Sequence, residues 1–273
     1  MHSSTPPPIS VVMLTRDGAA TLDRCLSSVA DFAEVLVYDN GSTDTTLEIA
    51  ARYPNVRIVK GTFDGFGPTR NRVDALARHD WVLKMDSDEW LSPELSAALL
   101  AASLDDSKTV YTFYLRNIMF GRVQRGLLGR QLMHRMYHRG QMHWVGSVHE
   151  YIERKDGEPM RMHFLPGLLW HNSYRSLGHM FQKRWYYAQP HLRRDHRLRP
   201  AHPAVAALRA LWRFLRCYVF QIGFIDGWRG FVLSVAEAYG TFLKYAWAYE
   251  ERARNSVARP LEQEKPELLP PRE

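Results

Sequence analysis

The chain up to about residue 100 alternates between short apolar runs and segments whose apolar residues recur every three to four positions. Four of the runs predict strands, at residues 9–14, 34–38, 56–60 and 81–85. The first run is almost continuously apolar, which is typical of a strand buried on both faces. After it, Leu22, Leu26 and Val29 have the spacing of an amphipathic helix. This alternation of strands and helices predicts a parallel sheet with helices on its faces.

Polar residues follow three of these runs at the point where each predicted strand ends. Thr15 and Arg16 follow the first run, Asp39 follows the second, and Asp86 and Asp88 follow the fourth. In open parallel sheets, ligands bind beyond the carboxyl ends of the strands. The sequence therefore predicts a binding site at one edge of the sheet.

The acids after the fourth run form an Asp86-x-Asp88 pair. In an extended chain, residues two apart point the same way, about 7 Å along the strand, so both carboxylates could face one cation. Such oxygen ligands suit Mg²⁺ or Mn²⁺, with substrate phosphates completing the coordination. Taken alone, the pair is better explained by a strand that ends in a polar turn before a helix capped by Ser92, with Pro93 at its first position. The polar residues after the other strands favour the cation site.

The middle of the chain has a different character. Residues 110–115 predict a further strand, and the rest, to residue 172, predicts short strands and loops with little helix. Histidine is frequent here, but its spacing matches no compact zinc pattern. Each of these histidines taken singly is best explained as a surface or hydrogen-bonded group: His134, His138, His143, His149, His163 and His171.

The pattern of residues 177–254 predicts helices, with a break at residues 199–203. Within residues 204–223, apolar side chains recur at helical spacing, and Arg209, Arg213 and Arg216 fall on the other face. A basic amphipathic helix with aromatic residues can lie on an anionic bilayer. The alternative is an ordinary helix that packs on the catalytic domain and leaves its arginines solvated. Further aromatic residues along this stretch favour membrane contact or self-association.

Composition narrows the choice of partners. The 273 residues suffice for one large domain with an appendage, and the two cysteines predict no disulfide framework, as in a reducing compartment. We see no secretion signal and no apolar stretch long enough to span a membrane. The net charge of +7 favours anionic partners. Because the basic residues are spread and no recognition motif occurs, we expect no nucleic-acid partner.

Four segments, in this order, look like an inverting family-2 glycosyltransferase with the GT-A fold: ISVVMLTRDGAATLDRCLSSV, VLVYDNGSTDTT, GPTRNRV and WVLKMDSDEW. The second is the most specific. Later segments, VGSVHE, LLWHNSY, residues 183–187 and GFIDGWRGF, are similar to bacterial lipopolysaccharide-core β-glucosyltransferases. The resemblance covers about residues 9–254. It implies an α/β nucleotide-sugar-binding fold with a mostly parallel central sheet and a helical C-terminal extension.

The resemblance also implies roles for the residues at the sheet edge. On the nucleotide-sugar side it places Thr15, Arg16, Asp39, Arg70 and Asp86, with Asp39 accepting a hydrogen bond from the base.

For the divalent cation, Mg²⁺ or Mn²⁺, the resemblance implies Asp86 and Asp88 as the acidic pair of the metal site, with Asp88 binding the cation that bridges the diphosphate. It implies a later contact to the metal or the phosphate from His171.

An inverting transfer needs a general base that takes the proton of the acceptor hydroxyl. Many family-2 enzymes carry an acidic pair in the acceptor half, where this chain has His149 and Glu150. We predict Glu150 as the base, with His149 orienting it or touching the acceptor. Glu89 is the alternative base. Glu150 could instead form a salt bridge with a nearby arginine, such as Arg139 or Arg154.

These inferences combine into an expected organisation. We predict a flexible lead at residues 1–8, a catalytic domain at 9–175 and a helical, membrane-associating or oligomerising extension at 176–258. A disordered tail follows at 259–273. Within the catalytic domain, residues 9–105 would bind the nucleotide sugar and 106–175 the acceptor.

The implied activity is transfer of a hexose, such as glucose from UDP-glucose, to a lipid-linked saccharide such as the lipopolysaccharide core. It would take place at the cytoplasmic face of the cell membrane, on an anionic lipid surface. The alternatives are transfer to another cell-envelope polysaccharide or glycolipid, and a non-catalytic membrane scaffold with the same fold. A nucleotidyltransferase is a poorer match, because the loop after the first strand lacks the basic, glycine-rich character that class needs.

Overall fold

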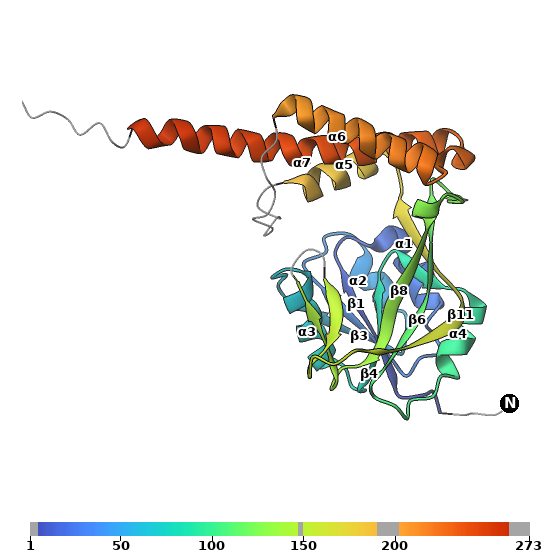
Figure 1. Cartoon of the computed structure of the whole chain (residues 1–273). Coiled ribbons are helices and arrows are strands. Elements are labelled where there is room, and N and C mark those ends of the chain that lie inside the picture. Colours follow the sequence, from blue (N-terminus) through green and yellow to red (C-terminus); the bar gives the residue numbers. More distant parts are fainter. Residues whose placement is uncertain (1–4, 147–149, 190–201, 262–273) are drawn as a thin grey trace, which may run out of the picture. The chain divides into compact units, whose positions relative to one another are not determined.

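The computed structural model describes residues 5–146, 150–189 and 202–261, with side chains as far as residue 254. The chain divides into two compact units, residues 1–175 and 176–273. Their elements are labelled in Figure 1. Within the described ranges, no helix combines the length and the hydropathy that crossing a membrane requires.

The first unit is built on a nine-stranded sheet with the order β3-β2-β1-β4-β8-β6-β11-β5, in which β7 pairs with β6 (Figure 1). The first four strands are mutually parallel. They are β1 (Ile9–Thr15), β2 (Glu34–Asp39), β3 (Val56–Lys60) and β4 (Trp81–Asp86). The helices that alternate with them are α1 (Ala19–Ser27), α2 (Thr46–Ala50) and α3 (Phe66–Leu76), followed by α4 (Pro93–Leu100). The predicted class, an α/β fold with a mostly parallel central sheet and C-terminal helices, is confirmed.

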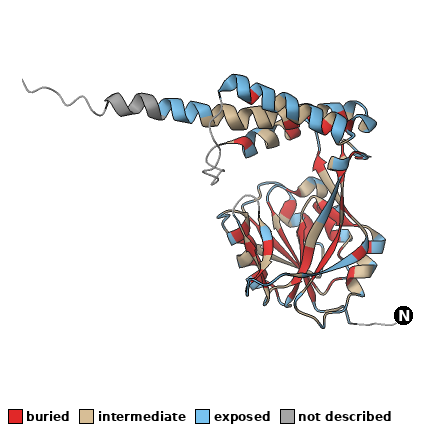
Figure 2. Cartoon of the chain, in the orientation of Figure 1, coloured by how far each residue is buried: buried red, intermediate tan, exposed pale blue. Residues whose placement is uncertain are grey.

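The apolar runs of β1, β2 and β4 form strands because both faces of these strands are buried (Figure 2), whereas the edge strand β3 is only partly buried. Val11 and Met13 on β1 pack with Leu22 of α1 in one core, whereas Val12 packs with Val73 of α3 in a second core. A strand covered on both sides needs apolar residues at every position. The four predicted strands therefore agree with the structure to within one residue at each end.

The other half of the sheet is mixed. It contains β5 (Glu89–Leu91), β6 (Thr109–Met119), β7 (Arg122–Val123), β8 (Arg130–His138) and β11 (Arg161–Tyr174). The 3-10 turn η1 (Leu127–Gly129) lies between β7 and β8. Strand β8 runs antiparallel between β4 and β6, and β11 pairs parallel with β6 and antiparallel with β5. A separate hairpin joins β9 (Met142–Val145) and β10 (Tyr151–Arg154).

The expectation of short strands in this half was wrong for β6 and β11, which have 11 and 14 residues. Strand β11 is interrupted by a register shift between Phe164 and Leu168. This irregularity breaks the period-two pattern by which a long strand is recognised in a sequence. The helix cap predicted at Ser92 is confirmed, since its side chain accepts a hydrogen bond from the amide of Leu95 and Pro93 opens α4.

The second unit is helical. It contains α5 (Leu177–Ala188), α6 (Pro203–Leu215), the π-helical turn η3 (Arg216–Phe220), the 3-10 turn η4 (Gly223–Asp226) and α7 (Trp228–Leu261). Both α5 and α6 pack on α7. The regular helix predicted to reach residue 223 ends at Leu215, and the backbone of Ile222 turns left-handed, with φ of 51°. Helix α7 enters the segment for which we predict disorder, and residues 262–273 lie outside the described residues.

Gly167 provides a test of how β11 packs on α4. Its φ is +90°, and a Cβ there would lie 2.4 Å from the backbone nitrogen of Leu95. We expect Gly167→Ala to lower the free energy of unfolding through both backbone strain and overpacking, by about 2–5 kcal/mol.

Gly157→Ala is the matched control, because Gly157 has a φ of +76° but nothing within 4 Å of its would-be Cβ. This control should lose only the strain, about 1–2 kcal/mol. Urea denaturation of both variants measures the difference. Equal losses would show that β11 does not approach α4 as closely as described.

Candidate active site

Thr15 and Asp39 end two adjacent strands and are register partners in the sheet. Asp39 is 2% exposed and accepts hydrogen bonds from the amides of Gly41 and Ser42, so its carboxylate holds the turn that follows β2. Thr15 is also buried, and its Oγ1 has no hydrogen-bond partner among the described residues. Arg16, with 70% of its side chain exposed, is the solvent-facing cation at this edge.

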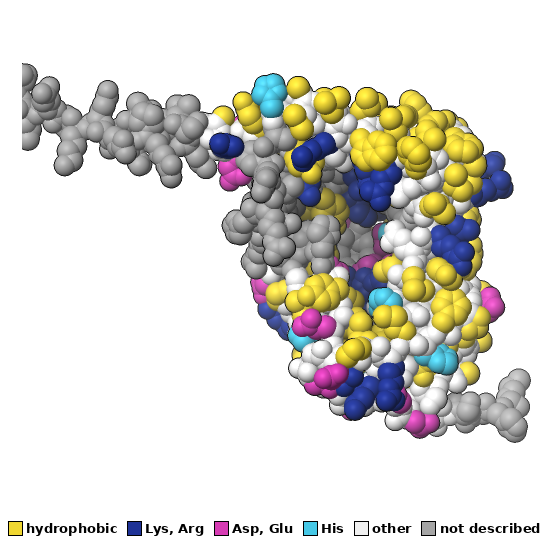
Figure 3. Space-filling model, viewed as in Figure 1, with side chains coloured by type: hydrophobic (Ala, Val, Ile, Leu, Met, Phe, Trp, Pro, Cys, Tyr) yellow, Lys and Arg dark blue, Asp and Glu magenta, His cyan; other side chains and the backbone are white. Residues whose placement is uncertain are grey.

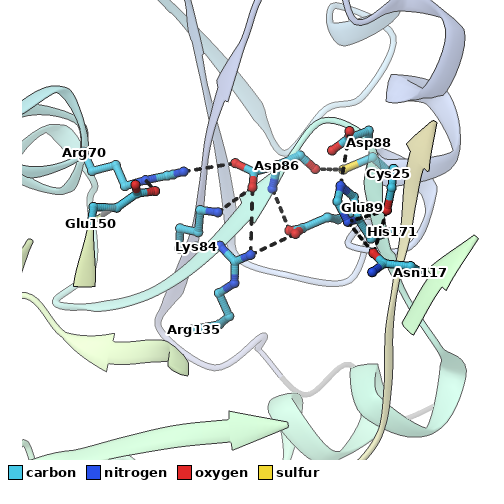
Figure 4. Close-up of polar contacts among 11 residues, drawn as sticks. Cys25, Arg70, Lys84, Asp86, Asp88, Glu89, Asn117, Arg135, Glu150 and His171 are labelled. Carbon is cyan, nitrogen blue, oxygen red and sulfur yellow. Dashed lines mark hydrogen bonds and ion pairs between the residues drawn. The ribbon is translucent and has the colours of Figure 1, made fainter. Parts of the chain in front are cut away.

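Asp86, at the end of β4, is surrounded by cations (Figure 4). Lys84 Nζ lies 2.5 Å from Asp86 Oδ2, Arg70 Nη2 lies 3.3 Å from Oδ1, and Arg135 Nη2 lies 3.9 Å from Oδ2. All three cationic side chains are buried. Burial acts to raise the pKa of Asp86, but the charges of Lys84 and Arg70 outweigh it and hold that pKa well below its usual range. Asp86 is therefore a fixed anion that binds these cations together.

The cations reach Asp86 from three elements. Lys84 stands two residues earlier on β4 and points to the same face. Arg70 comes from α3, and Arg135 comes from β8, which pairs with β4 in antiparallel register. Sequence reasoning missed Lys84 and Arg135. The i, i+2 spacing was an available signal for Lys84, whereas no local pattern indicates Arg135.

Glu89 is directed into the protein. It is 1% exposed, and its carboxylate accepts hydrogen bonds from Arg135 Nη2 and from the Asp86 amide, each at 2.9 Å. Burial and the nearby Asp86 charge raise the pKa of Glu89 to about 7. A carboxylate enclosed in this way is poorly placed to reach the hydroxyl of an incoming acceptor.

Glu150, the other candidate base, lies at the edge of the site and is held by Arg70. Arg70 Nε donates to Glu150 Oε1 at 3.1 Å, while its Nη2 reaches Asp86 (Figure 4). The Glu150 side chain is 18% exposed. Arg139 and Arg154, the salt-bridge partners considered from the sequence, bind other carboxylates. His149, expected to orient the base, lies outside the described residues.

Asp88 faces His171 from the turn between β4 and β5, with 3.4 Å between Asp88 Oδ2 and His171 Nε2. Pairing of β5 with β11 brings them together, and the amide of Asn172 donates to the carbonyl of Asp88 at 2.9 Å. His171 Nδ1 lies 2.8 Å from Asn117 Oδ1, and the amide nitrogen of Asn117 donates to the carbonyl of Leu128. This network makes Nδ1 the donor, so the lone pair of the neutral ring is on Nε2, toward Asp88.

Asp86 and Asp88 do not share one cation in the way that the extended-chain argument predicts. Strand β4 ends at Asp86, and residues 87–88 form a turn, so the i, i+2 geometry does not continue. The two carboxylates have separate partners, cations for Asp86 and an imidazole for Asp88 (Figure 4).

The Asp88–His171 pair is the part of the site that fits a divalent cation. In the part of the chain that the structure describes, no group of three or more His, Cys, Asp or Glu side chains could hold a metal. Mg²⁺ is usually bound through one or two protein ligands, with water and substrate phosphates filling its other positions. Two donors at an open edge, with the imidazole fixed by Asn117, fit this arrangement.

Comparison with known proteins gives the family. The profile of Glycosyl transferase family 2 matches residues 10–157, more than half of the chain. The chain belongs to glycosyltransferase family 2. The matched region runs from β1 to β10 and includes Asp86, Asp88 and Glu150.

The relatives of this glycosyltransferase include an uncharacterized glycosyltransferase of Rickettsia typhi, 26% identical, with 92% of this chain and 90% of the relative covered. An uncharacterized glycosyltransferase of Rickettsia prowazekii is also 26% identical, and the match covers 87% of this chain and 85% of that relative. Among solved structures, Staphylococcus aureus TarS is similar, with 16% identity and a TM-score of 0.44. The match covers 91% of this chain and 92% of the TarS chain. A second similar structure is Mycobacterium tuberculosis glucosyl-3-phosphoglycerate synthase, solved with Mn²⁺ and UDP-glucose. It has 24% identity and a TM-score of 0.31, and the match covers 41% of this chain and 44% of the synthase chain.

Family membership confirms the predicted glycosyltransferase class, and it removes the nucleotidyltransferase and nucleic-acid-binding alternatives as the main function. The closer resemblance to lipopolysaccharide-core enzymes stays a prediction.

The Glu89–Arg135 pair is testable by its contribution to stability. We expect Arg135→Met to lower the free energy of unfolding by about 3–5 kcal/mol, because Glu89 is left as a buried charge without its cation. Adding Glu89→Gln removes that charge and keeps an acceptor for the Asp86 amide, so the double variant should be more stable than Arg135→Met alone.

Chemical denaturation of the two single variants and the double variant measures this coupling. Arg78→Met is the control, because the Arg78 side chain is 66% exposed and its loss should cost less than about 0.5 kcal/mol. Strictly additive losses from Glu89→Gln and Arg135→Met would contradict the pairing.

Proposed function

We propose that this glycosyltransferase uses Mg²⁺ or Mn²⁺ to transfer a hexose, glucose from UDP-glucose, with inversion to a lipid-linked saccharide such as the lipopolysaccharide core. One observation carries the proposal: the Asp88–His171 pair and the Arg70-held Glu150 flank Asp86 at the edge where the parallel strands end (Figure 4). The two chemical tasks of the reaction, stabilising a leaving diphosphate and taking up a proton, thus have separate groups.

On the donor side, Asp88 and His171 would hold the cation. When bound, the cation stabilises the negative charge that builds up on the departing diphosphate. Arg16, exposed at the same edge, adds a positive charge that the diphosphate can approach. Asp86 acts through its partners, because its carboxylate keeps Arg70 in place.

On the acceptor side, Glu150 would accept the proton of the attacking hydroxyl. Arg70 holds one oxygen of the carboxylate at 3.1 Å, and the second oxygen can receive the proton. Inversion requires the base and the leaving group on opposite faces of the sugar. Figure 4 supports this division, because Glu150 and Asp88 lie on opposite sides of Asp86.

The proposed acceptor rests on the resemblance of residues 145–150, 168–174 and 223–231 to lipopolysaccharide-core enzymes. A lipid-linked acceptor would place the protein at the cytoplasmic face of the membrane. The assays below separate two alternatives. One is transfer to another envelope glycolipid, and the other is a scaffold that binds the donor without transferring the sugar.

The metal assignment predicts that Asp88→Asn weakens Mn²⁺ binding roughly tenfold or more and abolishes the Mn²⁺-dependent part of the thermal shift that UDP-glucose causes. The reason is that Asp88 provides the carboxylate of the pair. Titration calorimetry with Mn²⁺ and melting curves with and without the cation measure both effects.

Asp80→Asn is the control for this variant, because Asp80 is 63% exposed and pairs with Arg139 instead. A normal cation-dependent shift in Asp88→Asn would rule out the metal assignment. A cation-dependent shift with another nucleotide sugar, and none with UDP-glucose, would correct the donor.

The base assignment predicts that Glu150→Gln lowers kcat by about 10²–10⁴-fold while donor binding is retained, because an amide cannot take up the proton. The assay follows labelled glucose from UDP-glucose into glycolipid acceptors, including lipopolysaccharide core.

Glu153→Gln is the matched control, since Glu153 is three residues away, 44% exposed and paired with His143. An unchanged kcat in Glu150→Gln would disprove its role as base. Wild-type protein that binds donor and cation but transfers to no acceptor would support the scaffold alternative.

A further inference from the structure

Helix α6 carries its apolar side outward. Leu208, Leu211, Trp212 and Leu215 recur at helical spacing, and Leu208 is 67% exposed and Trp212 57% exposed. We call these four residues the α6 face. Figure 3 shows hydrophobic side chains gathered along this helix. A soluble helix normally buries such a stripe, so the α6 face has the character of an interaction surface.

Both arginines of α6 contact side chains of α7, although Arg209 is also exposed to solvent. Arg213 donates to Glu237 of α7 from Nη2 at 2.6 Å and from Nε at 3.2 Å. The guanidinium of Arg209 lies 4.2 Å from the ring centroid of Tyr245. Arg213 is therefore tied to α7, which the ordinary-helix alternative, with its arginines in water, does not expect.

The apolar surface continues past the end of α6 into the tip of the unit. Phe220, Phe224, Ile225 and Trp228 are 63%, 50%, 42% and 54% exposed. We call these four residues the tip. A connection between two helices usually carries polar residues, so four large exposed apolar side chains there are exceptional.

Two glycines shape the tip. A Cβ at Gly230 would lie 1.8 Å from the carbonyl oxygen of Gly223, and a Cβ at Gly223 would lie 2.7 Å from that of Cys217. Only glycine permits so close a backbone approach. The backbone is therefore tightly packed, and the apolar side chains of the tip point outward from a defined support.

We propose that the α6 face and the tip together form a surface that docks on an anionic lipid bilayer. Interfacial helices of this kind bury their apolar side among the lipid headgroups and upper acyl chains, with aromatic residues at the boundary. Residues 204–231 carry four arginines and one aspartate. Arg213 is paired with Glu237, so the surface charge comes from the other three arginines, with Asp226 as the one acid of the segment. Arg216 is exposed, and Arg229 lies 4.7 Å from the ring centroid of Trp228.

This charge favours lipid over a second copy of the chain. In a two-fold contact, the same patch faces itself, so the basic residues of both copies would meet. An anionic lipid surface complements them, and each arginine near the surface adds about fivefold to the affinity. The inference goes beyond the proposed donor chemistry and uses none of its residues.

The experiment measures co-sedimentation of the full chain with vesicles of phosphatidylcholine alone and of phosphatidylcholine with 30% phosphatidylglycerol, at roughly physiological salt. No donor or cation is present, so the result is independent of the proposed reaction. We expect the wild type to bind the anionic vesicles more tightly. Leu208→Gln/Leu211→Gln and Trp212→Gln/Phe220→Gln should each bind about tenfold more weakly or worse. Arg216→Gln should lose about fivefold on anionic vesicles only.

Leu127→Gln/Met162→Gln is the matched control, because both residues are 60% exposed apolar side chains of the first unit. It should bind as the wild type does, and melting curves show which variants fold. Because Arg216→Gln changes a single exposed charge, its result stands even where an apolar variant fails to fold.

The proposal fails if the wild type does not bind anionic vesicles, or if the face and tip variants bind as tightly as the control. Sedimentation without lipid provides the third outcome. A dimer that the face variants abolish, in a protein that ignores vesicles, would assign the surface to a second copy and overturn the proposal.

Discussion

A cluster of paired ionisable groups at the end of β4 is the constraint on which the site depends. Its cations Lys84, Arg70 and Arg135 are buried, and they face the carboxyl groups of Asp86, Glu89 and Glu150. Buried cations are tolerated only when each has its partner. The strand, the helix α3 and the strand β8 that supply them must therefore pack together in one arrangement. Stability and the geometry of the site thus have the same origin.

Within this cluster, Arg70 joins the two halves of the reaction. One of its nitrogens reaches Asp86 and another holds Glu150, which lies 80 positions later in the chain. The proposed metal-binding pair, Asp88 and His171, is held in another way, by the pairing of β5 with β11 and by the hydrogen bond from His171 Nδ1 to Asn117 Oδ1. The proposed inverting transfer needs this separation, because the group that stabilises the leaving diphosphate and the group that takes the proton would act on opposite faces of the sugar.

In the helical unit, too, a buried charge is paired with side chains from other elements. Glu237 of α7 is 9% exposed and binds both Arg184 of α5 and Arg213 of α6. Arg213 thus lies on the side of α6 that packs on α7, whereas the leucines and Trp212 of the α6 face are exposed. The proposed lipid contact uses this exposed apolar surface.

Continuous apolar runs and capping residues are local signals, so the sequence was enough to predict the parallel part of the sheet, the positions of β1 to β4 and the cap of α4. It also indicated that Asp39, Asp86 and Asp88 meet at one edge, since parallel strands end together. The folded structure was needed to show that Asp86 binds cations while Asp88 faces His171, because a turn at residues 87–88 separates them. It also showed that Arg135 compensates Glu89 and that α6 turns its apolar side outward, since both depend on contacts with elements far away in the chain.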